Sequence, residues 1–175
     1  MILGMSIASF TLFHVVLSLI GIASGLIVMV GLWAAKKLDG WTALFLATTV
    51  ATSVTGFLFH SAKFGPPHVI GLLSLLLLIL AVLARYSYHL AGSWRWIYIV
   101  TAMLSLYFNV FVLVAQLFMK VPALRALAPT QSEPPFKIAQ LVVLVLFLIL
   151  GTFAAKRFRG AAQSGPSQLR QASPA

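Results

Sequence analysis

The stretch "LSLYFNVFVLVAQLFMK" (residues 104–120) is apolar enough to lie in a bilayer, yet it contains an asparagine and a glutamine. An amide without a hydrogen-bond partner in hydrocarbon costs several kcal/mol, so both need a partner. Polar side chains recur here at helical intervals of four, four and seven residues: Thr101, Ser105, Asn109 and Gln116. At 100° per residue they share one helix face. The spacing predicts a membrane-spanning helix whose polar stripe faces other helices.

The composition of the whole chain is that of a membrane protein. Of its 175 residues, 61% are hydrophobic and only 8% are charged, which is too little polar surface for a soluble domain. Five apolar runs approach the ~20 helical residues needed to cross a bilayer. They lie near residues 9–35, 41–61, 68–87, 95–119 and 136–156. We therefore predict an all-α fold, an integral membrane bundle of about five transmembrane helices formed by residues 1–157.

Three other segments are expected to lie outside the spans. The segment "VPALRALAPTQSEPPF" (121–136) contains four prolines and is predicted to be a structured loop. Residues 158–175 are too polar to bury a core, so we expect a disordered cytoplasmic tail. The first ten residues contain no Lys or Arg, unlike a secretory signal peptide, and the first helix is expected to be retained.

The basic residues predict an orientation, because cytoplasmic loops of membrane proteins are enriched in Lys and Arg. One side would hold eight of them: Lys36, Lys37, Arg85, Arg95, Lys156, Arg157, Arg159 and Arg170. The other side would hold four: Lys63, Lys120, Arg125 and Lys137. This asymmetry predicts an outside N-terminus and a cytoplasmic C-terminus. The net charge of +10 is explained in the same way, with the lipid bilayer rather than nucleic acid as the partner.

Several kinds of chemistry lack the residues they need. The chain has no cysteine, which excludes disulfides, thiolate metal sites and thiol catalysis. Its two acidic residues, Asp39 and Glu133, fall in predicted loops, so no carboxylate is expected within a span. No GxSxG nucleophile motif occurs. We assign no enzymatic activity and no catalytic residue from the sequence.

Histidines near the predicted outer boundary are the candidates for a site. His14, His60 and His68 would lie at similar depth on three helices, and histidines on facing helices can ligate a metal or haem. The spacing shows no HxxxH or HExxH motif, so such a cofactor is a hypothesis without a motif. The candidate ligand-binding set adds polar side chains of the same region: His14, Ser18, His60, His68, Asn109 and Gln116.

The same residues also allow a purely structural interpretation. Gly21 and Gly25 form a GxxxG pattern on the face that carries His14 and Ser18, and small residues let helices approach closely. For Asn109 and Gln116 we favour hydrogen-bonding contacts between helices over the lining of a site or a water-filled path. We favour a membrane protein that binds a metal, haem or small ligand in an outer polar pocket. The alternatives are a structural or accessory subunit and, ranked below the pocket, a small transporter or channel. A homo-oligomer or a partner membrane protein is compatible with each of them.

Four runs of sequence resemble a known group of proteins: "GLWAAKKLDGWTALFLATTVATSVTGF" (31–57), "AGSWRWIYIV" (91–100), "YFNVFVLVAQ" (107–116) and "KVPALRALAPTQSEPPF" (120–136). The resemblance is to an uncharacterised family of small bacterial multi-spanning inner-membrane proteins, for which no activity is established. It covers roughly residues 10–159 and implies a bacterial inner-membrane location. It implies no functional residue.

Overall fold

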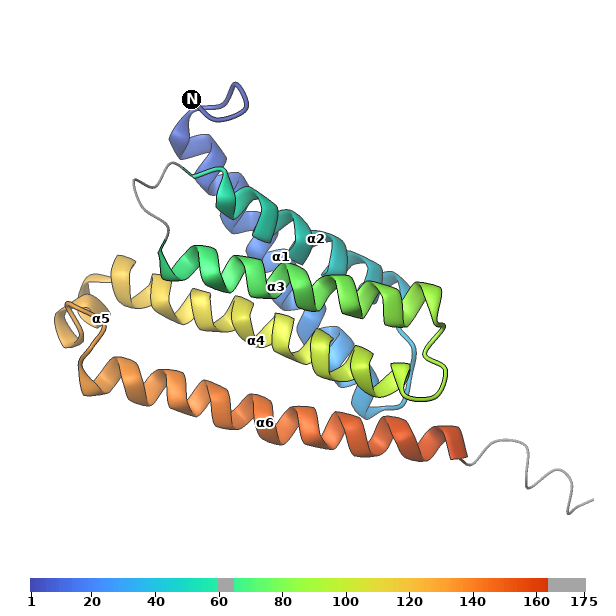
Figure 1. Cartoon of the computed structure of the whole chain (residues 1–175). Helices are drawn as coiled ribbons and strands as arrows, with labels where there is room; N and C mark the ends of the chain where they lie inside the picture. The colour runs from blue at the N-terminus through green and yellow to red at the C-terminus, as the bar shows by residue number, and fades with distance from the viewer. Residues whose placement is uncertain (60–64, 164–175) are drawn as a thin grey trace, which may run out of the picture.

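The protein is described by a computed structural model over residues 1–59 and 65–163, with the backbone alone for 158–163. Within these residues the chain is helical, and no strand occurs. The elements are α1 (Ile7–Trp33), α2 (Asp39–Phe57), α3 (Pro66–Val82), the π-helical turn η1 (Leu83–Ser87), α4 (Trp94–Lys120), α5 (Pro122–Leu127) and α6 (Pro134–Gln163) (Figure 1). The predicted all-helical class is therefore confirmed.

Local sequence signals explain where the helices begin. The Ser6 hydroxyl caps α1 by accepting a hydrogen bond from the Ser9 amide at 3.1 Å. Helices α3, α5 and α6 each begin with proline, which lacks the amide hydrogen that would be unpaired there. Pro122 also restricts the residue before it, so α4 ends at Lys120.

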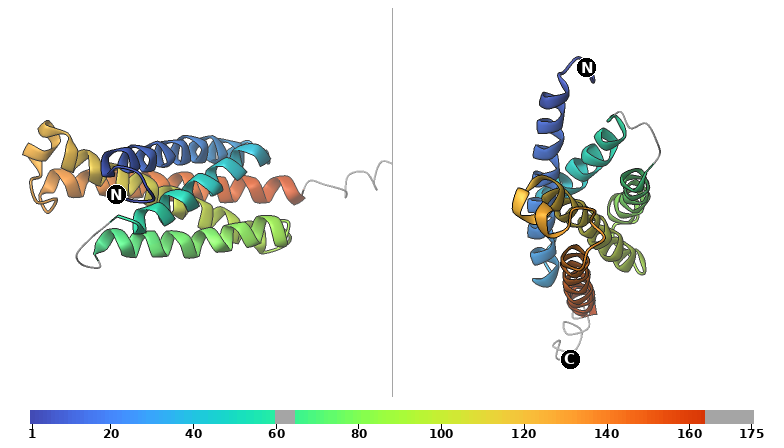
Figure 2. Two further views of the ribbon diagram at one scale, coloured as in Figure 1. Left: turned by 90° about the horizontal axis from the view of Figure 1, so that it is seen from above. Right: turned by 90° about the vertical axis from the view of Figure 1, so that its left-hand side faces the viewer.

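The long helices alternate in direction along the chain and lie side by side (Figures 1 and 2). Helix α4 is central because it packs against α1, α3 and α6, while α2 packs between α1 and α3. We call one end of the bundle the basic end, after six residues that it carries: Lys36, Lys37, Arg85, Arg95, Lys156 and Arg157. The opposite end, which carries the N-terminus and α5, is the loop end.

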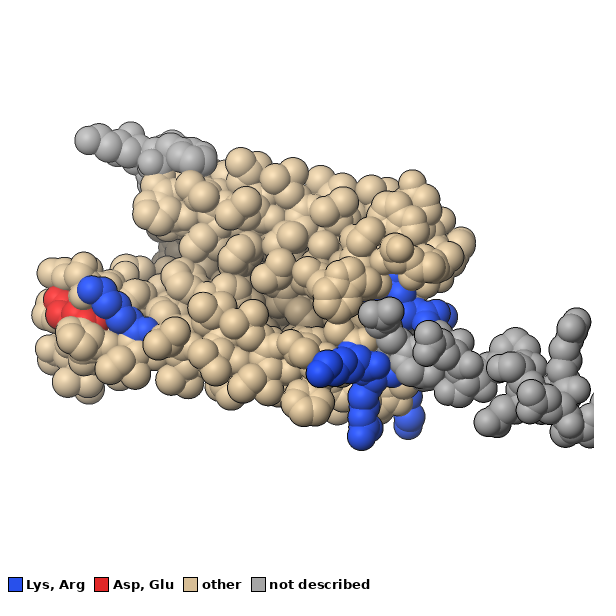
Figure 3. Space-filling view, turned by 60° about the horizontal axis from the view of Figure 1, so that its bottom comes forward, with Lys and Arg blue, Asp and Glu red and all other residues tan. Residues whose placement is uncertain are grey.

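Within the described part of the chain, four helices are long and apolar enough to cross a membrane: Ile7–Trp33, Pro66–Ser87, Trp94–Lys120 and Pro134–Arg157. Helix α2, the fifth predicted span, does not reach the same apolarity because it contains five threonines and a serine. On the face shown in Figure 3, the charged side chains gather at the two ends of the molecule, and the belt between them carries none. This distribution is that of a membrane protein.

Burial differs strongly among the helices. In the apolar windows of α1 and α4, 44% and 39% of residues are buried, against 22% in α3 and 17% in α6. The leucine-rich α3 therefore takes the peripheral position that its composition predicts. The core contains Val28 of α1, Phe45 of α2 and Leu106 of α4, and it extends to Leu78 of α3 and Ala154 of α6.

Helix α6 is longer than the sequence predicted. It continues through Gln163, whereas the tail was expected to begin at residue 158. Residues 158–163 of the predicted tail fall within this helix, where Arg159 and the run from Ala161 to Gln163 are good helix formers and Gly160 is not. Residues 164–175 lie outside the described part of the chain.

The segment between α4 and α6 is a structured loop, as predicted, and it is fastened to α4. The Gln131 side-chain amide donates to the Ala115 carbonyl at 2.8 Å, and Gln140 of α6 donates to the Phe111 carbonyl at 3.1 Å. The Glu133 carboxylate accepts hydrogen bonds from the Thr130 hydroxyl at 2.8 Å and from the amides of Thr130 and Ser132. Desolvation would raise the pKa of Glu133, but these hydrogen bonds outweigh it and lower that pKa.

Candidate functional site: two polar layers among α1, α2 and α4

The first polar layer lies toward the loop end and begins at His14. The His14 ring is half-buried, with Nδ1 2.8 Å from the Thr55 hydroxyl and its plane edge-on to the Phe59 ring at 5.2 Å. The Thr55 hydroxyl donates its own hydrogen to the Ala51 carbonyl at 2.7 Å. His14 Nδ1–H must then be the donor to Thr55, which fixes the tautomer of the neutral ring. His14 therefore acts as a contact between α1 and α2.

The other predicted residue of α1, Ser18, turns back onto its own helix. Its hydroxyl donates to the His14 carbonyl at 2.9 Å, one turn earlier. Ser18 is half-buried, and its hydroxyl hydrogen is used by the carbonyl of its own helix. It shares the face of His14, as the sequence predicted, and its hydrogen-bonding capacity is used within the helix.

Deeper in the same layer, Asn109 of α4 meets α2. Its side-chain amide donates to the Thr49 hydroxyl at 3.2 Å, while the neighbouring Thr48 donates to the Leu44 carbonyl at 2.7 Å. Gly21 lies against this contact, because a Cβ built there would be 3.3 Å from both threonine hydroxyls and 3.6 Å from Asn109 Nδ2. The Asn109 side chain therefore forms a closely packed hydrogen bond between α4 and α2.

Two other predicted residues lie elsewhere. His68 of α3 accepts a hydrogen bond at Nδ1 from the Gly65 amide at 3.1 Å and packs on the Phe57 ring at 5.8 Å. Thr55 and Phe57, which contact His14 and His68, are two residues apart and point to opposite sides of α2. The two histidines therefore do not converge. Gln116 is exposed rather than part of the buried stripe, which corrects the sequence prediction.

The hypothesis of a histidine metal or haem site gains no support from this geometry. His60 falls outside the described residues. Across residues 1–59 and 65–163, no three His, Asp or Glu side chains come together as metal ligands would. His14 and His68 each have Nδ1 engaged by the protein itself.

The second polar layer, at the basic end, was missed by the sequence analysis. Arg85 of η1, with only 7% of its side chain exposed, forms an ion pair with Asp39 at the start of α2. Its guanidinium also lies 5.5 Å from the ring centroid of Tyr98, which is fully buried. The Tyr98 hydroxyl is buried and makes no hydrogen bond of normal geometry. The layer therefore joins α2, η1 and α4.

One signal in the sequence could have indicated this ion pair. Asp39 is one of two acids in the chain, it precedes the second apolar run, and Arg85 ends the third run on the same predicted side. The π-helical turn could not be foreseen, although such turns often occur where a helix carries a functional or buried polar group. Here it brings Arg85 to the start of α2.

An apolar layer separates the two polar ones. At Gly25 a Cβ would lie 2.6 Å from Leu106 Cδ1 and 2.9 Å from two ring carbons of Phe45, so α1, α2 and α4 are in direct contact there. Ser105 and Ser24, nearby and almost fully buried, both donate to carbonyls of their own helices. The polar stripe is therefore not continuous from one end of the bundle to the other.

Comparison of the chain with protein-family models, with curated proteins and with solved structures finds no match.

Proposed function

We propose that the protein is a structural or accessory component of a bacterial inner membrane, whose internal polar groups hold its helices together. The observation that carries this proposal is the contact of Phe45 and Leu106 with the backbone at Gly25. It closes the centre of the bundle between the two polar layers. The hydrogen bonds of His14 to Thr55 and of Asn109 to Thr49 support the same interpretation.

The proposal includes five crossings of the membrane, with the N-terminus outside and the C-terminus in the cytoplasm. Helix α1 ends at the basic end and α3 begins at the loop end, so α2 must connect the two ends. Its 19 residues span about 28 Å, close to the ~30 Å of a hydrocarbon core. The basic end carries more Lys and Arg than the loop end, which supports its cytoplasmic placement.

The alternative functions need an opening that these contacts do not favour. A pocket for a metal, haem or small ligand would need His14 to face other ligands, whereas its ring is held by Thr55 and Phe59. A transporter would need a polar path past Phe45 and Leu106. Packing therefore explains more of the polar side chains than either alternative.

Accessibility of single cysteines tests this proposal, because the natural chain has none. Ser24→Cys and Ser105→Cys place a thiol at the closed centre, where both serines are at most 1% exposed. Ser132→Cys in the loop and Ser93→Cys at the basic end are exposed controls. The measurement is the rate of reaction with a small, water-soluble, membrane-impermeant thiol reagent, in intact cells and after permeabilisation.

A closed bundle with the proposed orientation gives a definite pattern. The cysteine at position 132 reacts from outside, the one at 93 reacts only after permeabilisation, and those at 24 and 105 stay unreactive in both. Rapid reaction at 24 or 105 in a folded protein would show water at the centre and would overturn the packing function in favour of a path. If instead the cysteine at 93 reacts from outside and the one at 132 reacts only after permeabilisation, the orientation is the reverse of the one proposed, and the packing function is unaffected.

A further inference from the structure

The outward surface of α6 near the basic end is hollowed, and the hollows are not explained by packing within the chain. One is lined by Trp33 of α1 and by Leu150, Phe153 and Arg157 of α6, and has a volume of about 380 Å³. A second, of about 320 Å³, lies beside it on α6 and ends at Lys156. Ile149 and Phe153 line both, so the exposed Phe153 ring forms a ridge between them.

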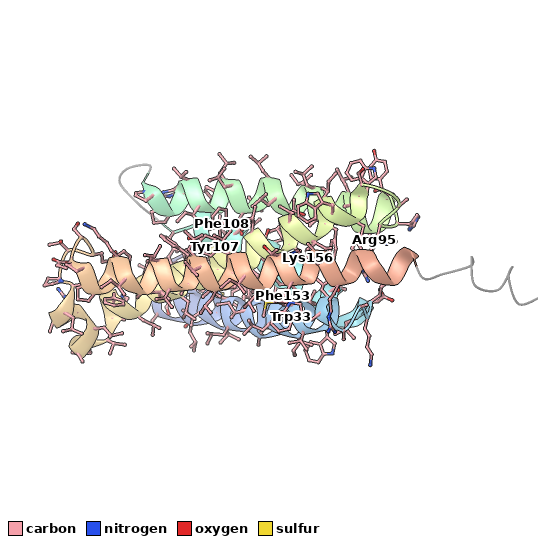
Figure 4. All side chains as sticks on the ribbon, turned by 90° about the horizontal axis from the view of Figure 1, so that it is seen from below. Trp33, Arg95, Tyr107, Phe108, Phe153 and Lys156 are labelled. Carbon is pink, nitrogen blue, oxygen red and sulfur yellow. The ribbon has the colours of Figure 1, made fainter. Side chains whose placement is uncertain are left out.

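The spacing along α6 gives these hollows a direction. Ile149, Phe153 and Arg157 are four residues apart and share a face, which changes from apolar to basic over about 12 Å. Lys156 lies next to Arg157, and both side chains are exposed. Figure 4 shows Trp33 and Phe153 together along one side of α6, with Tyr107 and Phe108 on the other side.

The Trp33 ring forms an apolar wall of the larger hollow and is held in place by a hydrogen bond. Its indole nitrogen, the only polar atom of the side chain, donates to the Leu150 carbonyl at 3.1 Å. The part of the ring that faces the hollow therefore offers only hydrocarbon. Two open, mainly apolar hollows, each with a cation in its lining at the basic end of the bundle, match the shape and charge of a two-chain lipid with an anionic headgroup.

We propose that the two hollows together form a groove along α6 and beside α1, and that this groove binds one anionic phospholipid. The acyl chains lie on either side of Phe153, and the phosphate lies between Lys156 and Arg157. The surrounding charge favours an anion, because the exposed Lys36 and Lys37 follow Trp33 closely and the acid at this end, Asp39, is paired with Arg85. This inference goes beyond the structural function proposed above and does not depend on whether the polar layers are closed.

Trp33 itself provides the probe. A variant with the other three tryptophans changed to phenylalanine retains Trp33 alone, and it is reconstituted into bilayers with lipids brominated on the acyl chains. Bromine quenches the fluorescence of a tryptophan that it contacts. The ratio of the quenching by brominated phosphatidylglycerol to that by brominated phosphatidylcholine therefore gives the relative affinity of the groove for the anionic lipid.

The expected result is a preference for phosphatidylglycerol that falls about fivefold in Arg157→Ala, corresponding to about 1 kcal/mol for a cation at the membrane surface. Lys137→Ala is the matched control, because Lys137 is an exposed cation on the same helix at the loop end. It should leave the preference unchanged. Both substitutions are exposed, and circular dichroism verifies that each variant is folded.

Three outcomes would overturn the proposal. Equal quenching by the two lipids would mean that Trp33 meets ordinary bilayer lipid without a headgroup site. An equal loss of preference in Lys137→Ala would assign the effect to the net charge of the protein. Absence of quenching by either lipid, together with a dimer in detergent, would show that a second copy of the chain covers the groove.

Discussion

The substitution Gly25→Ala tests the closest contact between helices in this bundle. The new methyl group would lie 2.6 Å from Leu106 Cδ1 and 2.9 Å from the Phe45 ring, distances at which atoms must move. Leu106 can rotate its methyl group away, but the Phe45 ring is 1% exposed and enclosed by its neighbours. The helices α1 and α2 must therefore separate slightly, and the packing around Phe45 is lost in part.

The magnitude follows from two opposing effects. Overpacking of a dense core costs about 1–3 kcal/mol. Replacing glycine by alanine in a helix returns up to about 1 kcal/mol in water, and less in a membrane, where the separated helices are already formed. We expect Gly25→Ala to lower the free energy of unfolding by about 1–2 kcal/mol. In Gly21→Ala the new methyl group would lie 3.3 Å from two threonine hydroxyl oxygens. Because these contacts are longer than those at Gly25, the loss in the free energy of unfolding should be less than about 1 kcal/mol.

The assay is unfolding of the detergent-solubilised protein by increasing sodium dodecyl sulfate, followed by circular dichroism. Gly40→Ala is the control, because a Cβ there meets no atom within 4 Å. The expected order of stability is Gly40→Ala, then Gly21→Ala, then Gly25→Ala. If Gly25→Ala is as stable as Gly40→Ala, the three helices are not in contact at this level, and the closed centre on which the structural function rests is wrong.

Three further measurements follow from individual contacts. Asn109→Leu removes one bond between helices and should cost about 1 kcal/mol in the same unfolding assay, whereas no loss of stability would mean that the bond to α2 is not formed. Asp39→Asn weakens the ion pair with the buried Arg85 and should lower the free energy of unfolding by about 1–3 kcal/mol. If Asp39→Asn lowers stability by the same amount in an Arg85→Met background, the two side chains do not interact. Glu133 is the only glutamate, so selective ¹³C labelling gives a single carboxyl signal, whose pKa should lie below the ordinary value for glutamate and return toward it in Thr130→Ala. Since the pKa is lowered on folding, the contribution of this carboxylate to loop stability is present at neutral pH and is lost as the pH falls through the lowered value; a normal titration in the natural protein would contradict the hydrogen bonds described.

The helical architecture could be predicted because hydrocarbon imposes length and apolarity on each span. The polar stripe was predictable in part. Thr101, Ser105 and Asn109 are buried or half-buried, as a period of 100° per residue requires. Gln116 has nearly the same angular position as Asn109 but is exposed, because α1 and α2 tilt away from α4 toward the loop end (Figure 1). Periodicity gives the face of a helix, whereas the tilt of its neighbours decides how far that face stays covered.

The histidine site could not be judged from sequence for a related reason. Similar depth in the membrane does not establish that two side chains meet, because a third helix can lie between them. Here α2 separates His14 from His68, and each contacts a different side of it. The ion pair of Asp39 and Arg85 was hidden because it depends on the π-helical turn that ends α3. The separation of the histidines depends on how α2 is rotated about its axis, and the ion pair depends on an irregular turn. Neither can be predicted from the pattern of apolar residues.

If the membrane is crossed five times, as we propose, helix α2 is the span that apolarity alone does not identify. Thr48 and Thr55 donate their hydroxyl hydrogens to carbonyls one turn earlier, at 2.7 Å in each case, so both hydroxyls are satisfied within the helix itself. A threonine-rich helix can therefore enter hydrocarbon at a lower cost than its composition suggests. Threonine oxygens of α2 can also accept hydrogen bonds from other helices, as Thr55 does from His14 and Thr49 does from Asn109. The least apolar helix is thus the one best suited to lie between the others, because its polarity is used for association rather than exposed to lipid.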